Sequence, residues 1–230
     1  MMLSSRFSAG HSAGKAVIFD FEGTLVDFQW QLAPAQAELR AALAALGCEG
    51  EAFARGNYAT MWNAAVDRLA PQGRMAELRQ ALCPIYDRWD RDALTRWSPR
   101  AGAAELLGRL AAGGVRAGMV SNVGRQALDA ALARFGFLGR LAPVVSRDEV
   151  SRMKPAAEGI LRLLAEWRLD AGEVLFVGDS RADVRSARAA GVRVAIVLGG
   201  ECGEADFADD PPDRMMAHLD ELDGPASVKK

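Results

Sequence analysis

Histidine and cysteine are both scarce in this chain of 230 residues, which contains two histidines and three cysteines. The histidines, His11 and His218, lie near opposite ends of the sequence, which argues against a histidine-based metal site and most histidine-dependent chemistry. The cysteines, Cys48, Cys83 and Cys202, are far apart, odd in number and without metal-type spacing. The simplest interpretation is a reduced, cytoplasmic protein.

Long apolar runs and an excess of one charge are also missing. Half of the residues are hydrophobic, a quarter are charged, and the formal net charge is −2. No apolar run approaches the length of a membrane span, and no basic field predicts binding to nucleic acid or to a membrane surface. Residues 1–15 are rich in Ser, Gly and Ala without an apolar core, so we interpret them as a disordered tail and not as a signal peptide.

The chain is organised around residues 16–27, AVIFDFEGTLVD. Four apolar residues run into Asp20, Glu22 follows two places on, and Gly23 and Thr24 come next. A short apolar run bounded by turn residues predicts a buried strand of a parallel sheet. Asp20 would then stand at the carboxyl end of the strand, where open α/β sheets bind ligands. Two acids beside a flexible glycine suit a cation or a nucleophile; the alternative is a strand that simply ends in an acidic turn.

The block that follows the first strand has no strand signals. Apolar residues at helical spacing predict helices over 31–47, 52–69 and 75–97. Pro84 is expected to start or kink a helix, because proline lacks the N–H that a helix interior needs. We therefore predict an all-helical insertion, residues 28–97, between the first strand and the rest of the sheet.

After residue 98, strands and helices alternate. The predicted strands cover 115–120, 143–145, 173–177 and 192–198, and the predicted helices cover 101–112, 125–135, 156–168 and 182–190. One last helix is expected around 214–222. Alternating strands and helices indicate βαβ units, hence an α/β fold with a mostly parallel, Rossmann-like sheet and helices on both faces.

Polar residues recur where the predicted strands end or a helix begins. They are Ser121 and Asn122 after the second strand, Lys154 at a helix start, and Asp179, Ser180 and Asp183 after the fourth strand. Parallel strands end at one edge of a sheet, so these residues should converge with Asp20 and Glu22. Oxygen ligands select a hard cation such as Mg²⁺, while lysine, hydroxyl and backbone N–H groups suit a phosphate. Carboxylates repel a phosphate unless a cation lies between them, so one metal ion reconciles both halves of the site.

These motifs, in this order, resemble those of the haloacid dehalogenase-like hydrolase superfamily. The matching segments are Asp20-Phe21-Glu22-Gly23-Thr24, Ser121-Asn122, Lys154-Pro155, and Gly178-Asp179-Ser180 with Asp183. The helical insertion directly after the first motif is similar to the cap of the phosphoglycolate-phosphatase-like branch. The resemblance covers roughly residues 15–222 and implies a core of residues 16–27 and 98–230 with a small helical cap of residues 28–97.

The resemblance implies a covalent mechanism. Asp20 would attack phosphorus and form an aspartyl-phosphate, which splits one hard displacement into two easier ones. Mg²⁺ would be held by the Asp20 carboxylate, the main-chain carbonyl of Glu22 and Asp179, and Asp183 would support or join that set of ligands.

The resemblance also implies which residues contact the substrate. Ser121 would bind a phosphoryl oxygen through its hydroxyl, helped by N–H groups nearby such as those of Asn122. Lys154 would offset the charge of nucleophile and phosphate. Gly23 and Thr24 would shape the turn beside the nucleophile. The implied substrate is a small phosphorylated metabolite, and phosphoglycolate is indicated by resemblance alone.

Glu22 departs from the pattern, since phosphatases of this family usually have Asp there as general acid and base. One extra methylene displaces the carboxyl, and misplacement of that order costs about 10²-fold in rate. Glutamate has a pKa close to that of aspartate and stays chemically competent. We therefore expect an active but slow phosphatase that a Glu22→Asp change would speed up. The dehalogenase branch is disfavoured, since nothing there explains a glutamate at this position.

Substrate choice is expected to depend on the helical insertion. Trp62, Trp89 and Trp97 are expected to form the core of a helical bundle and not an aromatic ligand cage. Phe28, Gln29 and Trp30 are candidates for a hinge or a cap edge. Six arginines could bind a second anionic group, although most are expected on a solvated face: Arg55, Arg68, Arg74, Arg88, Arg91 and Arg96.

Two other functions stay open. The segment around Ser180 nearly spells a nucleophile elbow, and Asp206 or Asp209 and then His218 follow in serine-hydrolase order. Against this, Ala182 replaces the last glycine of the elbow, and a helix N-cap is the preferred role for the serine. The second alternative is a non-catalytic protein of the same fold that binds phosphorylated ligands or a protein partner. Loss of turnover in an Asp20→Asn variant would separate the enzyme from this binder.

Overall fold

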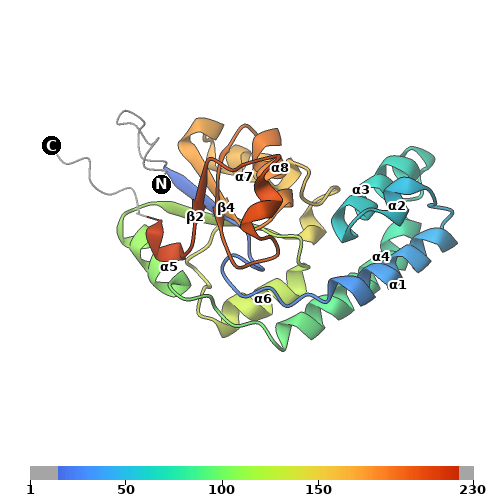
Figure 1. Ribbon diagram of the computed structural model, residues 1–230, viewed down its shortest axis with the longest axis horizontal. Helices are drawn as coiled ribbons and strands as arrows, with labels where there is room; N and C mark the ends of the chain where they lie inside the picture. Colours follow the sequence, from blue (N-terminus) through green and yellow to red (C-terminus); the bar gives the residue numbers. More distant parts are fainter. Residues whose placement is uncertain (1–14, 223–230) are drawn as a thin grey trace.

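A computed structural model describes residues 15–222 of the chain (Figure 1). Residues 1–14 of the predicted tail lie outside the described residues. Six strands form one sheet in the order β3-β2-β1-β4-β5-β6, and every neighbouring pair is parallel. The strands are β1 Ala16–Phe19, β2 Arg116–Val120, β3 Val144–Val145, β4 Val174–Gly178, β5 Arg193–Val197 and β6 Arg214–Met216. The predicted α/β fold with a parallel sheet is confirmed.

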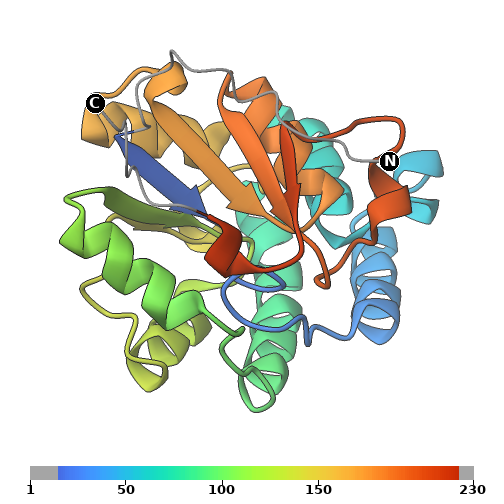
Figure 2. The same ribbon diagram turned by 60° about the vertical axis from the view of Figure 1, so that its left-hand side comes forward.

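The helices form three groups around this sheet. Helices α1 to α4 gather beside it, α5 and α6 lie on one face, and α7 and α8 lie on the other (Figures 1 and 2). Their bounds are α1 Leu32–Ala45, α2 Glu51–Ala54, α3 Tyr58–Leu69, α4 Met75–Leu94, α5 Ala103–Ala112, α6 Arg125–Arg134, α7 Glu158–Trp167 and α8 Arg181–Ala189. Within residues 15–222, none of the helices combines the length and the apolar character that crossing a membrane would require.

The central strand β1 is buried on both faces. Val17 and Phe19 pack into the apolar cluster under α5 and α6, and Ala16 and Ile18 pack into the cluster under α7 and α8. This alternation follows from the period of two along a strand. The chain leaves β1 toward β2 and β3 on one side and later forms β4 to β6 on the other. The strand order therefore reverses at β1, which opens a crevice at its carboxyl end.

The helical insertion shares one apolar cluster with the α5 and α6 face of the core. Trp62 is fully buried within the insertion, as predicted, and Trp89 is partly buried. Trp97 is also fully buried, but it lies where the insertion returns to the core and packs edge-to-face on Phe21, with ring centroids 5.1 Å apart. The insertion is thus packed against the core and is not a separate bundle.

Two sequence predictions for the insertion were wrong in detail. The helix expected over 52–69 is divided into α2 and α3. Asn57 ends the continuity, because its side-chain oxygen accepts hydrogen bonds from the N–H groups of Ala59 at 3.1 Å and Thr60 at 2.9 Å, which makes it the N-cap of α3. Pro84 lies inside α4, so of its two expected roles the start of a helix is wrong, while the kink stays a prediction. Burial of neighbours such as Tyr86 offsets the backbone bond that proline removes.

The helix predicted around residues 214–222 was also wrong. Arg214–Met216 forms strand β6, and only a short 3₁₀ turn, Leu219–Glu221, follows it. The strand pairs with the outer edge of β5, and the Leu198 N–H donates to the Met216 carbonyl at 2.8 Å. A three-residue strand has no periodicity of its own to detect, so its sheet partner decides its conformation.

Candidate active site

The predicted convergence of polar residues at one sheet edge is present in the structure. Asp20 directly follows β1, Ser121 follows β2, and Asp179 follows β4. The Asp20 N–H donates to the Val177 carbonyl of β4 at 2.8 Å, which fixes the nucleophile candidate beside the next strand end. A pocket of about 490 Å³, including its open part, lies over this edge and is also lined by residues of the helical insertion.

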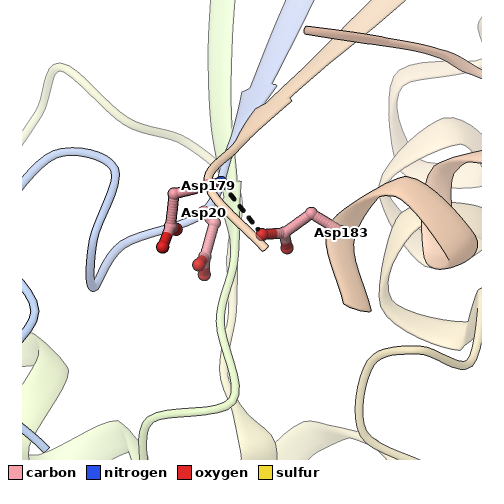
Figure 3. Close-up of side chains that lie close together, drawn as sticks. All are labelled: Asp20, Asp179 and Asp183. Atoms are coloured by element: carbon pink, nitrogen blue, oxygen red, sulfur yellow. Dashed lines mark hydrogen bonds between the residues drawn. The ribbon is translucent and has the colours of Figure 1, made fainter. Parts of the chain in front are cut away.

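Three buried carboxylates lie close together at this edge, those of Asp20 and Asp179 side by side and that of Asp183 directed toward them (Figure 3). One oxygen each of Asp20, Asp179 and Asp183 lies within 4.8 Å of the others. Burial, followed by the charges of Asp183 and Asp20, raises the pKa of Asp179 well above its usual value. Such mutual repulsion fits a site built for a divalent cation, and an all-oxygen donor set favours a hard ion. The carboxylates of Asp20 and Asp179, with the Glu22 main-chain carbonyl, could hold Mg²⁺.

The packing around Asp179 supports the same interpretation. Gly23 has a φ of +82°, and a Cβ atom on either Gly23 or Gly200 would overlap the Asp179 carboxylate. Thr24 Oγ1 donates to Asp179 Oδ1 at 2.8 Å, and the Glu201 N–H donates to Asp179 Oδ2 at 2.7 Å. The Glu201 N–H and the Thr24 hydroxyl thus hold the Asp179 carboxylate in a space that the two glycines leave free. A metal ligand is expected to be oriented in this way.

The Gly200→Ala variant is expected to weaken Mg²⁺ binding by about 10–100-fold, the usual cost of disturbing groups that orient a metal ligand. Gly200 has an ordinary φ, so the added methyl acts by displacing Asp179 and not through backbone strain. Calorimetric titration of the protein with Mg²⁺ measures the effect. Gly172→Ala is the matched control, because its added methyl would meet no atom within 4 Å. Equal Mg²⁺ affinity in the two variants would contradict Asp179 as a ligand.

Lys154 bridges the acidic cluster. Its Nζ lies 2.6 Å from Asp20 Oδ1 and 2.7 Å from Asp183 Oδ1, and the side chain is buried. Desolvation disfavours the ammonium, but the charges of Asp183 and Asp20 outweigh it and raise the pKa of Lys154. Burial raises the pKa of Asp20 to about 6, with the charge of Lys154 opposing the shift. Lys154 therefore stays charged and partly neutralises the nucleophile candidate.

Asp183 and Ser180 form a capping box at the start of α8. Asp183 Oδ2 accepts from the Asp179 N–H at 3.1 Å, the Ser180 N–H at 3.0 Å and the Ser180 hydroxyl at 2.7 Å. The preferred N-cap role of Ser180 is confirmed. Among residues 15–222, no histidine lines the pocket, so the serine-hydrolase alternative has no base beside the hydroxyl.

Asn122 and Thr24 lie where the motifs place them, but both hold other parts of the site. Asn122 Oδ1 accepts from the Lys154 N–H at 3.0 Å, and its Nδ2 donates to the Lys154 carbonyl at 3.1 Å, so its amide fixes the lysine loop. Thr24 is fully buried and bonds to Asp179. Ser121 lines the pocket and its Oγ accepts from the Val123 N–H at 3.2 Å.

Glu22 lines the pocket and also connects it to the helical insertion. Its Oε1 accepts three hydrogen bonds, from the N–H groups of Gln29 at 2.8 Å and Trp30 at 2.6 Å and from the Trp97 indole at 2.8 Å. Within residues 15–222, no hydrogen bond reaches its Oε2. Burial raises the pKa of Glu22 to about 8, against the opposing effect of the Trp97, Gln29 and Trp30 donors.

Several pocket residues were not predicted from the sequence. Glu201 lies after β5, and burial together with the charges of Asp183 and Asp20 raises its pKa to about 7. Its position after a fifth parallel strand was a usable signal, since that strand ends at the same edge. Tyr58, Tyr86 and Asp90 come from the insertion, and no local pattern marks them.

Asp90 belongs to a buried ion pair between α4 and the core. Arg147 Nη1 lies 2.7 Å from Asp90 Oδ2, its Nη2 lies 2.5 Å from Asp87 Oδ1, and its guanidinium lies 4.9 Å from the centroid of the Tyr86 ring. Asp90 Oδ1 also accepts from the Trp30 indole at 3.1 Å. These contacts hold the insertion over the sheet edge, so both parts contribute to one pocket.

Comparison with known proteins identifies the family of the chain. The family model of the haloacid dehalogenase-like hydrolases matches residues 15–191. The chain is 31% identical over 215 residues to a phosphoglycolate phosphatase of Yersinia pseudotuberculosis, covering 90% of this chain and 91% of that protein. It is 29% identical over 189 residues to an N-acetylmuramic acid 6-phosphate phosphatase of Pseudomonas aeruginosa, covering 81% and 82%.

Solved structures show the same fold. A haloacid dehalogenase-like hydrolase from Bacteroides fragilis superposes with a TM-score of 0.66 at 22% identity, covering 91% of this chain and all of that one. A hydrolase from Pseudomonas syringae superposes with a TM-score of 0.65 at 20% identity, covering 90% and 98%.

The fold is that of a hydrolase family built on a Rossmann-like sheet, and the chain belongs to the haloacid dehalogenase-like hydrolases. Its helical insertion directly after the first motif, together with its phosphoglycolate phosphatase relatives, places it in the phosphoglycolate phosphatase-like branch with a helical cap.

Proposed function

We propose that the protein is a Mg²⁺-dependent phosphatase that hydrolyses a small phosphomonoester through an aspartyl-phosphate on Asp20. The observation that carries this proposal is the meeting of Asp20, Asp179 and Lys154 at one point of the sheet edge. A nucleophilic carboxylate, a partner carboxylate for a cation and a buried ammonium are the groups that phosphoryl transfer needs. Bound Mg²⁺ would supply positive charge for the phosphoryl oxygens.

In the first step, a carboxylate oxygen of Asp20 forms a bond to phosphorus and the bond to the leaving oxygen breaks. Lys154 holds Asp20 Oδ1, which leaves Oδ2 for the attack. Ser121 lines the pocket, and its hydroxyl would donate a hydrogen bond to a phosphoryl oxygen of the substrate. Asn122 acts through the lysine loop that its side chain fixes.

Glu22 is our candidate for the general acid and base. Oε1 is held by three N–H donors, so Oε2 is the oxygen available to protonate the leaving alkoxide. In the second step, the same oxygen takes a proton from the water that attacks phosphorus, the P–O bond to Asp20 breaks, and phosphate leaves. Asp183 positions Lys154 and the turn before α8, and it also stands close enough to support a bound cation.

We also propose that residues 28–97 act as the cap over this pocket, and residues 16–27 and 98–222 as the core; residues 223–230 of the predicted core lie outside the described residues. Tyr58 and Tyr86 of the insertion line the same pocket as Asp20, which supports a cap that contributes to substrate binding. The relatives' substrates by name, phosphoglycolate and N-acetylmuramic acid 6-phosphate, are both small phosphomonoesters. They support a small phosphomonoester as the class of substrate here.

Phosphate release from a panel of small phosphomonoesters tests this function, with Mg²⁺ and with an excess of chelator. We expect release that needs Mg²⁺ and that falls to background when chelator is added, because the carboxylate cluster repels a phosphate without a cation. Restoring Mg²⁺ should restore the rate. Mg²⁺ binding without release from any panel member would favour the non-catalytic binder of phosphorylated ligands.

A further inference from the structure

The charges that line the pocket are unusual for a site that takes an anionic substrate. Four carboxylates line it, those of Asp20, Glu22, Asp90 and Glu201, and Lys154 is the one cationic side chain that lines it among residues 15–222. Lys154 is already paired with Asp20 and with Asp183 of the carboxylate cluster. A phosphoryl group on Asp20 would occupy this end of the pocket, so no cation is left for a second anionic group.

The arginines of the insertion do not supply that cation. Arg91 borders a separate hollow beside Asp87, and Arg68 donates to the Glu49 carbonyl. Four more form ion pairs with acids of the insertion itself: Arg55 with Glu51, Arg74 with Glu77, Arg88 with Glu38, and Arg96 with Asp92. The last two donate to carbonyl groups away from the pocket, Arg40 to those of Phe53 and Gly56 and Arg79 to that of Val150. On the core side, Arg147 is held by Asp87 and Asp90.

Four aromatic side chains also line the pocket. Trp30 packs against Tyr58 and Tyr86 with ring centroids 4.8 Å and 6.2 Å away, and Phe28 lines the pocket with them. Aromatic faces bind the apolar faces of carbon chains and rings, whether or not these carry hydroxyls. This wall therefore adds affinity for a carbon skeleton without adding a positive charge.

Glu201 differs from the other pocket carboxylates in having no hydrogen-bond partner for its side chain within residues 15–222. Glu22 and Asp90 both accept from N–H groups of the protein. The Glu201 main-chain N–H bonds to Asp179, which fixes this residue beside the acidic cluster. Its carboxylate can accept a hydrogen bond from a hydroxyl of the leaving group, and it would repel a carboxylate there.

We propose that this pocket selects phosphomonoesters whose leaving group carries hydroxyls and no second anionic group, a sugar or polyol phosphate, and that Glu201 is the residue that sets this choice. The proposal rests on the proposed phosphatase function. It sets this chain's preference apart from phosphoglycolate, whose leaving group carries a carboxylate.

Matched substrate pairs that differ by one carboxylate test the proposal. The pairs are glycerol 3-phosphate with 3-phosphoglycerate, and sorbitol 6-phosphate with 6-phosphogluconate, each assayed for kcat/KM with Mg²⁺. We expect the uncharged member of each pair to be favoured by at least about tenfold. Glu201→Gln keeps the size of the side chain and removes its charge, so it should shrink that ratio by raising kcat/KM for the carboxylated member. Glu204→Gln, on the exposed surface of the same loop, is the control and should leave the ratio as in the wild type.

Binding separates failure of this proposal from failure of the phosphatase function. Dissociation constants of the same pairs are measured with the Asp20→Asn variant and Mg²⁺, so the preference is seen even if the wild type releases no phosphate. Absence of release would count against the phosphatase, whereas a tenfold binding preference for the uncharged members would still support the selectivity. Equal or tighter binding of the carboxylated members, or a ratio that Glu201→Gln leaves unchanged, would overturn it.

Discussion

Replacing Asp20 by asparagine is expected to lower kcat for phosphomonoester hydrolysis by at least about 10³-fold, because an amide cannot form the covalent intermediate. The change is nearly isosteric, and Asp20 is buried, so its neighbours need not move. Lys154 keeps Asp183 as its partner at 2.7 Å, which preserves the ammonium in its place. The measurement is Mg²⁺-dependent phosphate release, read beside the thermal stability of both proteins.

The covalent step gives a second readout for the same variant. Wild-type protein quenched in acid during turnover should carry phosphate on one side chain, and the Asp20→Asn variant should carry none. Asp27→Asn is a suitable control, since Asp27 bonds to the Ser98 N–H at 2.7 Å, outside the pocket. A variant at Asp20 that kept full activity would refute the proposed mechanism, whatever its stability.

The sequence predicted the parts of this site that depend on strand ends. Asp20, Ser121 and Asp179 each follow an apolar run, and a parallel sheet must bring such positions to one edge. Lys154 follows no strand; its place at a predicted helix start was a weak signal, which the order of the motifs strengthened. The structure explains its place through Asn122, which bonds to both main-chain polar groups of the lysine.

The cap side of the site could not be predicted in the same way. Tyr58 and Asp90 lie on helices whose periodicity shows which face is apolar but not where that face docks. Their positions depend on the buried contact between Arg147 and Asp90, which joins residues 57 apart in the sequence. The prediction for residues 214–216 was wrong for a similar reason, because the conformation of strand β6 depends on its pairing with the edge of β5.

Glu22 is the residue for which sequence and structure lead to opposite expectations. From the sequence alone, the extra methylene predicts a misplaced acid that Glu22→Asp would correct. In the structure, the longer side chain lets Oε1 accept from the N–H groups of Gln29 and Trp30, where the chain enters the insertion. It also lets Oε1 accept from the Trp97 indole, where the chain returns to the core. An aspartate would fall short of these three donors, so the glutamate is part of how the cap is held over the pocket.

We therefore expect Glu22→Asp to lower kcat/KM, by about 10²-fold, the cost of misplacing a reacting group and the elements around it. Glu22→Gln separates the two roles of the side chain. Its amide oxygen can still accept from Trp97 and the two backbone N–H groups, but the side chain can no longer act as an acid. With an alkyl phosphate as substrate, kcat/KM of the Glu22→Gln variant should fall by about 10²–10⁴-fold.

Substrates with different leaving groups distinguish loss of the general acid from loss of the contacts that hold the cap. The p-nitrophenolate group of p-nitrophenyl phosphate leaves without needing a proton. The first chemical step with this aryl ester therefore does not depend on a general acid. With the aryl ester, the Glu22→Gln variant should therefore transfer the phosphoryl group to Asp20 at close to the wild-type rate, measured in a single turnover. Glu22→Asp should be slow on both esters because its cap contacts are lost. Trp97→Phe, which removes one donor and leaves the glutamate in place, should resemble Glu22→Asp and not Glu22→Gln. A Glu22→Asp protein faster than the wild type would instead establish Glu22 as a displaced acid, with no part in holding the cap.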